Sequence, residues 1–524
     1  MRMTNKIMQN NSLYNINNNK VLQDKLSTQM STQKKLTRPS DDPVVAIRAL
    51  RLRTSVSELT QFYEKNAPDA ESWLKVTEDA LGTGAEVLTD MVKQATKAAN
   101  KDLTTDDLNI ILEQMKNLKD EYYSTGNVDY AGRYVFTGYR TDTTLSFTEE
   151  IEDMNQQPSY EITEQVTIGK FDTVNYTMKD KLDGISQTNY SGGNYDDVVE
   201  QQISNTDIYR LRLAYDDLSA KTVPSVSPGL TDADGNAVAI EATNANGDAF
   251  SMDEAYLAIA SANANNESKA VFCAETGEIL FSKAAYESLE GSVTPDTEIK
   301  VTYTKDSWEN GDLRPEHYFA CKATTVEDGQ TKTVNYNQEY LRGEEESQVI
   351  EYDVGYNQTI RVNTTAREAF THDLDRDIDD LQIMMAQLTE ITGTLDELTK
   401  VKEGMSETDP DYKLITNQVD AAQKAYDYIR EGVHELFETT ITRMQTHLDD
   451  TNIAVTDNGT RSSRLELVSN RLMEQKTTFQ TLQSENEDVD ITETAIQLTS
   501  TELTYEAALM ATGKIMQTSL MNYI

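Results

Sequence analysis

Histidine is the side chain most often used for proton transfer and zinc binding, and this chain has only four. They are His317, His372, His434 and His447. A helical zinc-protease pair needs a second histidine four residues after the first, but the residue four positions after His434 is Glu438. The sequence also contains no glycine-rich phosphate loop and no Gly-x-Ser-x-Gly nucleophile motif. We therefore expect surface histidines and no catalytic centre.

Carboxylates are the other groups that could act as catalytic acids or bases, but they are so numerous that no single pair indicates an active site. With 89 aspartates and glutamates, chance alone supplies pairs at catalytic spacing. The densest run is Asp375, Asp377, Asp379 and Asp380. We interpret it as a solvated helix face. Weak binding of a divalent cation is the alternative, although the run lacks the glycine and the terminal glutamate of a calcium loop. The sequence thus predicts no cofactor and no metal site.

The charge balance restricts the partners. The 524 residues include 47 Lys and Arg against 89 Asp and Glu, a formal charge of -42, which argues against nucleic acid or any partner bound through phosphates. No apolar run approaches the roughly 18 residues of a membrane span, and residues 1–6 lack the apolar stretch of a cleaved signal peptide. We therefore expect neither membrane insertion nor the general secretory route. Cys273 and Cys321 are too few for a disulfide framework, and whether they pair stays open.

Heptad-like apolar spacing predicts long helices at both ends of the chain. The first runs from Pro43 to about residue 100, with Asp42 as its cap and Pro68 expected to kink or break it. A second helix is predicted over residues 105–123. In the C-terminal third, an amphipathic pattern begins near residue 366, is interrupted at 484–488, and restarts after Asp490 with Glu493 in a capping-box-like arrangement.

The first residues of the chain have a weaker helical signal of the same kind. Residues 10–19 contain six asparagines, which are poor helix formers, yet Ile7, Tyr14 and Val21 recur at intervals of seven. Such a segment would be marginal alone and could fold once a neighbouring helix covers its stripe. We expect the last helix to be that neighbour, so that the termini pair with each other and with other copies.

The middle of the chain differs in pattern and charge. Residues 141–360 hold 14 basic and 41 acidic side chains, a net charge of -27, which is typical of a solvated outer domain. Ile299, Val301 and Tyr303 alternate as in a strand, and residues 271–281 predict a hairpin that turns at Gly277. Tyrosines between residues 122 and 139 are interpreted as a hairpin packed on the preceding helix, with a recognition surface as the alternative. The expected fold class is α+β, with helical ends around a mixed, mainly β insertion at 148–361.

Specific motifs give the chain a family resemblance. The stretch Arg38-Pro39-Ser40-Asp41-Asp42-Pro43, running into Arg48-Ala49-Leu50-Arg51, resembles the N-terminal region of the flagellar hook-associated protein 3 family. Flagellin usually has a different stretch there, without the first proline. Residues 134–139 with 141–143, and residues 354–358 with 360–363, are similar to that family before and after its insertion. The C-terminal end, residues 507–524, is similar to flagellins and junction proteins alike.

The resemblance implies a structural protein and no enzyme: a junction protein of the bacterial flagellum. It implies an assembly of copies in a ring that contacts the first hook-associated protein on one face and flagellin on the other. It also implies export through the flagellar type III channel without a cleaved signal peptide, an export chaperone on the last helix, and an extracellular location at the hook–filament boundary. A flagellin filament subunit, or an extracellular binding module carried by the insertion, is the alternative.

Pattern and resemblance together predict three domains and two groups of interface residues. Residues 1–42 with 490–524 would form a terminal coiled-coil core that is disordered before assembly. Residues 43–147 with 362–489 would form a helical rod domain with a β-hairpin, and residues 148–361 a variable outer domain. The predicted motif and subunit interface comprises Arg38, Pro39, Asp41, Asp42, Pro43 and Arg48. The predicted assembly or chaperone-binding helix presents Leu498, Tyr505, Leu509, Met510, Ile515, Met516 and Leu520.

Overall fold

A computed structural model of the chain describes residues 5–148, 157–179, 181–182, 198–231, 236–327, 330–343 and 348–521. The described chain divides into two compact units. Unit 1 comprises residues 1–71, 352–360 and 463–524, and unit 2 comprises residues 72–351 and 361–462. The boundaries of the three predicted domains stay predictions.

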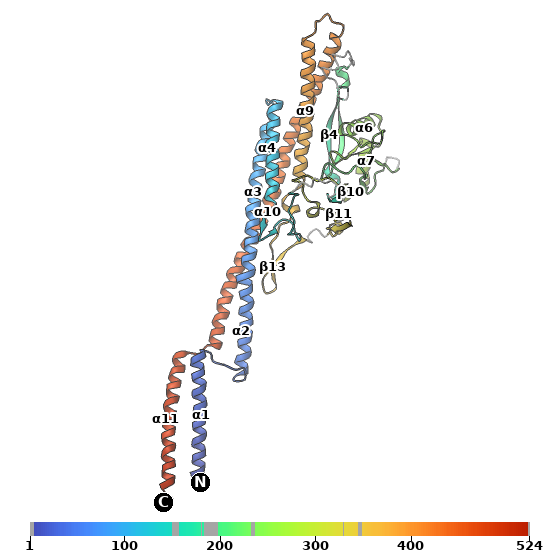
Figure 1. Ribbon diagram of the computed structural model, residues 1–524. Helices are drawn as coiled ribbons and strands as arrows, with labels where there is room; N and C mark the ends of the chain where they lie inside the picture. Colours follow the sequence, from blue (N-terminus) through green and yellow to red (C-terminus); the bar gives the residue numbers. More distant parts are fainter. Residues whose placement is uncertain are drawn as a thin grey trace. The chain divides into compact units, whose positions relative to one another are not determined.

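Unit 1 contains the two terminal helices, which lie side by side with the chain ends at the same end of the pair (Figure 1). They are α1 (Asn5–Thr32) and α11 (Ile491–Met521). The unit also holds α2 (Pro43–Gln61), the last part of α10 (Tyr412–Glu487), and most of a hairpin made by β13 (Glu351–Gly355) and β14 (Gln358–Arg361).

The expected break at Pro68 does not occur. A π-helical turn, η1 (Phe62–Asn66), follows α2 and leads directly into α3 (Ala67–Ala98). In this wider turn the Ala67 N–H donates to the Phe62 carbonyl. Pro68 lacks a backbone donor and closely follows this π-turn, where wider bonds already replace the regular α-helical ones. The chain therefore remains helical from Pro43 to Ala98, so a break at Pro68 was wrong, whereas a kink there stays a prediction.

Unit 2 is built on helices that pack through buried aromatic and aliphatic side chains. The predicted second helix is present as α4 (Thr105–Thr125), capped by Thr104, and it packs against α9 (Asp373–Glu403) (Figure 1). The short α8 (Ala366–Ala369) comes just before α9. Tyr122, Phe136 and Phe370 form a fully buried ring cluster, in which Phe136 and Phe370 stand edge to face with centroids 4.8 Å apart.

The insertion forms two five-stranded sheets that gather on one side of α9, together with α6 (Met252–Asn265) and α7 (Lys283–Ser292) (Figure 1). The first sheet has the order β12-β11-β3-β10-β6 and the second β4-β5-β9-β8-β7. Their strands are β3 (Ser159–Val166), β4 (Phe171–Met178), β5 (Ser204–Arg212), β6 (Ser225–Ser227), β7 (Ile240–Glu241), β8 (Ala270–Cys273), β9 (Glu278–Phe281), β10 (Ile299–Lys305), β11 (Ala320–Glu327) and β12 (Gln330–Tyr336). A small hairpin, β1 (Asp129–Tyr130) and β2 (Arg133–Tyr134), and the 3-10 turns η2 (Ile168–Lys170), η3 (Glu200–Gln202), η4 (Pro315–His317) and η5 (Tyr340–Arg342) complete the elements.

The local strand predictions are confirmed. In β10, Ile299, Val301 and Tyr303 are buried and alternate with half-buried residues. Strands β8 and β9 pair as the predicted hairpin, and Gly277 in its turn has a φ of 62°. A Cβ at this position would lie 1.9 Å from the Tyr215 carbonyl oxygen, so the turn requires glycine for space as well as for conformation. The α+β fold class is confirmed as well.

The small hairpin packs against α3, and both cysteines are free. Tyr130 of the hairpin contacts Trp73 of α3, with ring centroids 6.2 Å apart. Packing of the hairpin tyrosines on the preceding helix stays a prediction. Cys273 and Cys321 are both buried and unbridged. Within the described ranges, no helix combines the length and apolar character needed to cross a membrane.

Candidate functional site

The family-like motif forms the loop between α1 and α2. Asp42 caps α2 by accepting hydrogen bonds from the backbone N–H groups of Val44 and Val45, at 3.0 and 3.1 Å, and Pro43 occupies the first helical position. Before the cap, the Asp41 N–H donates to the Arg38 carbonyl at 3.0 Å, and the Asp41 carboxylate accepts from the Arg38 N–H at 3.2 Å. These bonds order the loop, while the side chain of Arg38 is exposed.

A second loop, between α10 and α11, is tied to the first by backbone bonds. The Lys35 N–H donates to the Glu487 carbonyl at 2.7 Å, and the Val489 N–H donates to the Gln33 carbonyl at 3.1 Å. Lys34 and Asp488 form an isolated antiparallel bridge. The C-terminal loop ends where predicted, because the Asp490 carboxylate accepts from the N–H groups of residues 492 and 493, at 2.8 and 3.1 Å. The two loops therefore form one structure, which we call the loop junction (residues 33–42 and 484–490).

An ion cluster lies at the loop junction and joins it to α2. The Arg53 guanidinium donates to both carboxylate oxygens of Glu487, at 2.7 and 2.5 Å, and Lys34 lies 3.6 Å from Glu487 and 2.5 Å from Asp488. Glu487 is buried, and the hydrogen bonds from Arg53 hold its pKa below the usual value. Lys34 likewise holds the pKa of Asp488 below its usual value. Sequence reasoning missed Lys34, Arg53 and Glu487, since nothing local shows that residues 434 positions apart will pair.

The predicted motif residues divide between two places. Arg38 and Pro39 line a hollow of about 170 Å³ beside the ion cluster, whose other walls include Val45, Ala49 and Leu50. Pro43 and Arg48 are exposed on α2 and do not line it. Asp41 bonds to the backbone of Arg38 within the loop, and Asp42 caps α2. The motif therefore combines a folding role in its aspartates with an accessible basic and apolar surface around its arginines.

The seam between α1 and α11 is more polar than the heptad pattern indicated. The covered positions of α1 are Gln9, Ser12, Ile16, Asn19, Gln23, Leu26, Thr28, Gln29 and Met30, and those of α11 are Thr494, Ala495, Leu498, Thr501, Tyr505, Ala508 and Thr512. Across this seam, Gln23 donates to the Glu502 carboxylate at 3.3 Å. A seam with so many hydroxyl and amide groups buries little apolar area, so the isolated pair gains little hydrophobic free energy.

Several large apolar side chains of both helices face outward. Ile7, Tyr14 and Val21 are exposed, so our expectation that the last helix of the same copy covers this stripe was wrong. The residues predicted on α11 also divide: Leu498 and Tyr505 are half-buried in the seam, whereas Leu509 and Met510 are exposed. The side chains of Ile515, Met516 and Leu520 lie outside the described residues. The outward faces need a partner to become buried.

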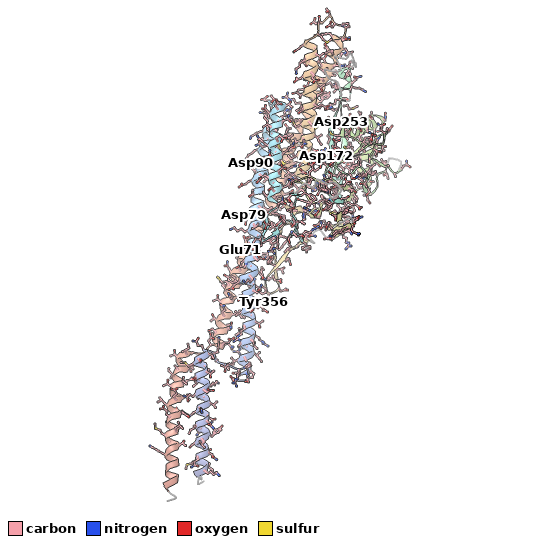
Figure 2. The ribbon with its side chains drawn as sticks, viewed as in Figure 1. Glu71, Asp79, Asp90, Asp172, Asp253 and Tyr356 are labelled. Atoms are coloured by element: carbon pink, nitrogen blue, oxygen red, sulfur yellow. The ribbon has the colours of Figure 1, made fainter. Side chains whose placement is uncertain are left out.

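Unit 2 contains a buried network of charges that links the second sheet to α9 and α10. Arg210 donates to Asp380 at 3.0 and 2.7 Å and to Glu278 at 2.5 Å, and Arg212 donates to Asp377 and Asp380, both at 2.8 Å. Asp172, labelled in Figure 2, also accepts from the Arg210 guanidinium at 2.8 and 3.0 Å. Burial raises the pKa of Asp380, but the guanidiniums of Arg210 and Arg212 outweigh this effect and lower it.

This network corrects two expectations from the sequence. Asp377 and Asp380 are buried and Asp375 and Asp379 half-buried, so the acidic run is not a solvated helix face. The histidines are not surface residues either, because His372 is half-buried and the others are buried. One of them, His447, contacts the Asp377 carboxylate at 2.9 Å through its Nε2. Distant arginines, invisible to a local pattern, compensate the buried carboxylates.

A cleft of about 350 Å³ borders the network, between β4, α6, α9 and α10. Its charged groups already bind one another: Arg210 is held by three carboxylates, and the Glu278 carboxylate also accepts from the Tyr256 hydroxyl at 3.0 Å. Over the described part of the chain, no group of three or more histidine, cysteine or carboxylate side chains has the arrangement of a metal site. The arrangement ties the second sheet to α9 and α10 through buried ion pairs.

The comparisons with known proteins match the region that carries the motif. Residues 3–141 fit the family model described as the bacterial flagellin N-terminal helical region. Flagellar hook-associated protein 3 of Salmonella typhimurium is 29% identical over 143 residues, which are 27% of this chain and 45% of that protein. The Escherichia coli protein of the same name is 29% identical over 151 residues, 29% of this chain and 47% of that protein. The resemblance to hook-associated protein 3 is confirmed.

The likeness is regional, because the chain spans about half the length of the curated relatives that it matches. Among solved structures, FlgL of Xanthomonas campestris is 12% identical, with 83% of this chain and 99% of that chain covered and a TM-score of 0.29. The flagellar junction protein FlgL from Legionella pneumophila is 10% identical, with 80% and 99% covered and a TM-score of 0.28. Both relatives by sequence are named as flagellar hook-associated protein 3.

Proposed function

We propose that this chain is a non-enzymatic junction protein of the bacterial flagellum, which joins the hook to the flagellin filament as a ring of copies. The observation that carries the proposal is the outward apolar surface of α1 and α11, in a chain whose N-terminal region is similar to hook-associated protein 3. A soluble monomer gains nothing from such a surface, whereas an assembling subunit buries it. One face of the ring contacts the first hook-associated protein, and the other contacts flagellin.

The same surface accounts for export and location. An extracellular protein that passes unfolded through the flagellar channel needs no cleaved signal peptide, and its last helix must be shielded before assembly. An export chaperone that holds an amphipathic helix in a groove would bind the outward side of α11, including Leu509 and Met510. In this account residues 1–42 and 490–524 order on assembly, residues 43–147 and 362–489 form the rod, and residues 148–361 face outward.

The arginines of the motif supply directional contacts between subunits. Within the described chain, Arg38 and Arg48 are exposed and have no carboxylate within ion-pair distance, so both are accessible to a neighbouring molecule. The aspartates contribute through folding, since Asp42 is engaged in the helix cap. Replacing Arg48 with Ala should therefore leave the stability of the monomer unchanged and impair filament attachment.

Removal of the gene tests the proposal. Cells without the protein should build hooks but release flagellin into the medium, and a plasmid copy should restore attached filaments. The Arg48→Ala variant should restore them poorly, while the equally exposed control Arg51→Ala tests whether any lost arginine has this effect. Normal filaments on cells that lack the protein would contradict the proposed function.

A flagellin filament subunit is the second candidate, because the matching family model is that of flagellin itself. The two candidates differ in whether assembly stops after one layer. Long filaments formed by the purified chain alone would favour the flagellin subunit, and short closed assemblies would favour the junction protein.

A further inference from the structure

The cleft beside the charge network has the size and lining of a small-molecule site. It is bordered by β4, α6, α9 and α10, and β4 runs alongside α9 (Figure 1). Its volume of about 350 Å³ lies within the usual range for ligand pockets, roughly 300–1,000 Å³, and such pockets are mostly apolar with a few polar groups. The apolar side chains that line this cleft are Val174, Met252, Ile383, Met384 and Leu436.

The two ends of the cleft differ in what their polar side chains bind. At one end lie Asp380 of α9 and Arg443 of α10, which are 3.4 Å apart within the charge network. At the other end, about two turns along each helix, lie Gln387 and Glu435. Within the described chain, neither of these two side chains forms an ion pair or a hydrogen bond. The network end is therefore closed by its own contacts, whereas the other end has polar groups available to a ligand.

The charge of the lining favours a positively charged ligand. The charged side chains that line the cleft are four carboxylates and two guanidiniums, a net charge of -2: Asp172, Glu278, Asp380, Glu435, Arg210 and Arg443. The arginines bind the first three carboxylates, so Glu435 is the one left without a cation. An ammonium group beside Glu435 would compensate its charge, while an anion would be repelled.

Space for an apolar ligand depends on a glycine inside α10. Glycine destabilises the interior of a helix, yet Gly432 lies within this helix and lines the cleft. A Cβ at position 432 would lie 3.1 Å from the Cε of Met384, closer than ordinary contact, so the methionine would have to move. By contrast, a Cβ on Gly459 of the same helix would meet nothing within 4 Å. The missing side chain at position 432 thus leaves room beside a methionine, a residue that adapts to differently shaped ligands.

We propose that this cleft binds a small amphipathic amine, a ligand with one ammonium group and an apolar body. The ammonium group donates to the Glu435 carboxylate and to the side-chain oxygen of Gln387. The apolar body packs on Met384 and Leu436, and the ion pairs of the network stay intact. This inference goes beyond the proposed function and does not rest on it, because binding is measured on the purified protein.

Calorimetric titration of the full-length protein with three probes of equal chain length tests the class of ligand. The probes are octylamine, octanol and octanoate, which are positively charged, neutral and negatively charged at neutral pH. We expect octylamine to bind to a single site per chain, octanol more weakly and octanoate least, at near-physiological salt, where attraction to the acidic surface as a whole is screened. No binding of octylamine, or binding of either other probe as tight as that of octylamine, would overturn the inference.

A charge substitution on α10 locates the ammonium group. Glu435→Gln should weaken octylamine binding about fivefold and leave octanol binding unchanged, because only the charge at this end of the cleft is lost. The matched control is Glu438→Gln, which is exposed on the same helix but does not line the cleft. Equal losses in the two variants would indicate diffuse attraction to an acidic surface and contradict the proposal.

A filling substitution locates the apolar body. Gly432→Leu should weaken binding of both octylamine and octanol by roughly tenfold or more, because the new side chain occupies the cleft. Leucine is the better helix former, so the variant should keep its fold, which thermal unfolding checks. Gly459→Leu in the same helix is the matched control and should bind both probes normally. Undiminished binding by folded Gly432→Leu would overturn the inference.

Discussion

Replacing Asp380 with Asn should release the second sheet from α9. Asp380 is 4% exposed and accepts hydrogen bonds from Arg210 at 3.0 and 2.7 Å and from Arg212 at 2.8 Å. Arg443 also lies 3.4 Å away. The substitution keeps the shape of the side chain but removes the charge, so the buried guanidiniums lose part of their compensation.

The size of the stability loss depends on the carboxylate partners that the two arginines keep in the variant. Removing one partner of a buried ion pair costs about 3–5 kcal/mol of the free energy of unfolding. Arg210 would keep Asp172 and Glu278, and Arg212 would keep Asp377, so we expect the lower end, about 3 kcal/mol. The matched control is Asp90→Asn on α3, labelled in Figure 2, where an exposed carboxylate pairs with Lys93 at 2.7 Å. The control should cost at most about 1 kcal/mol.

Tryptophan fluorescence during urea unfolding measures this difference locally. Trp308 is buried and its ring centroid lies 5.4 Å from that of Tyr215, close to the end of β5. In a Trp73→Phe background it is the single tryptophan, since the chain has two. A local probe is needed because a chain of several units need not unfold in one step. A loss in the Asp380→Asn variant no greater than in Asp90→Asn would refute the view that this network fastens the insertion.

Three further changes test other parts of the structure. Asp42→Ala should cost about 0.5–2 kcal/mol and Asp42→Asn much less, because asparagine also caps helices, as thermal unfolding would measure. The pKa of Glu487 is lower in the folded protein than its unfolded value of 4.5, so the ionised Glu487 stabilises the fold above pH 4.5, and this stabilisation is lost as the pH falls through the folded pKa. Proteolysis of the 33–42 loop should accelerate over that fall in pH, except in the Glu487→Gln variant. Burial lowers the pKa of His317 to about 4 from 6.5, so the unfolded chain binds the proton more readily and stability should fall by about 3 kcal/mol between pH 6.5 and 4. His317→Gln should make the denaturant midpoint less dependent on pH between 6.5 and 4. An unchanged pH dependence would contradict the lowered pKa of His317.

The sequence predicted the features that depend on neighbours along the chain. Asp42 and Pro43 identify a helix start because the cap bonds span two and three residues. The alternation in β10 is visible because burial on one face repeats every second residue. Glycine at position 277 similarly indicates a turn from local backbone preference.

Features that depend on distant residues could not be predicted from one sequence. Periodicity shows that Ile7, Tyr14 and Val21 share a face, but not whether the same copy or another copy covers that face. The run around Asp377 resembles a solvated surface until Arg212, which is 165 residues away in sequence, is brought against it. The loop junction was missed for the same reason, because Arg53 and Glu487 meet only after both ends of the chain have folded.

The most direct test of the central claim is the position of the protein on isolated flagella. Gold-labelled antibody against the insertion would be viewed by electron microscopy, with hooks isolated from cells that lack the gene as the control. Our account predicts a single band at the boundary between hook and filament. Label along the whole filament, or no label on the flagella, would contradict it.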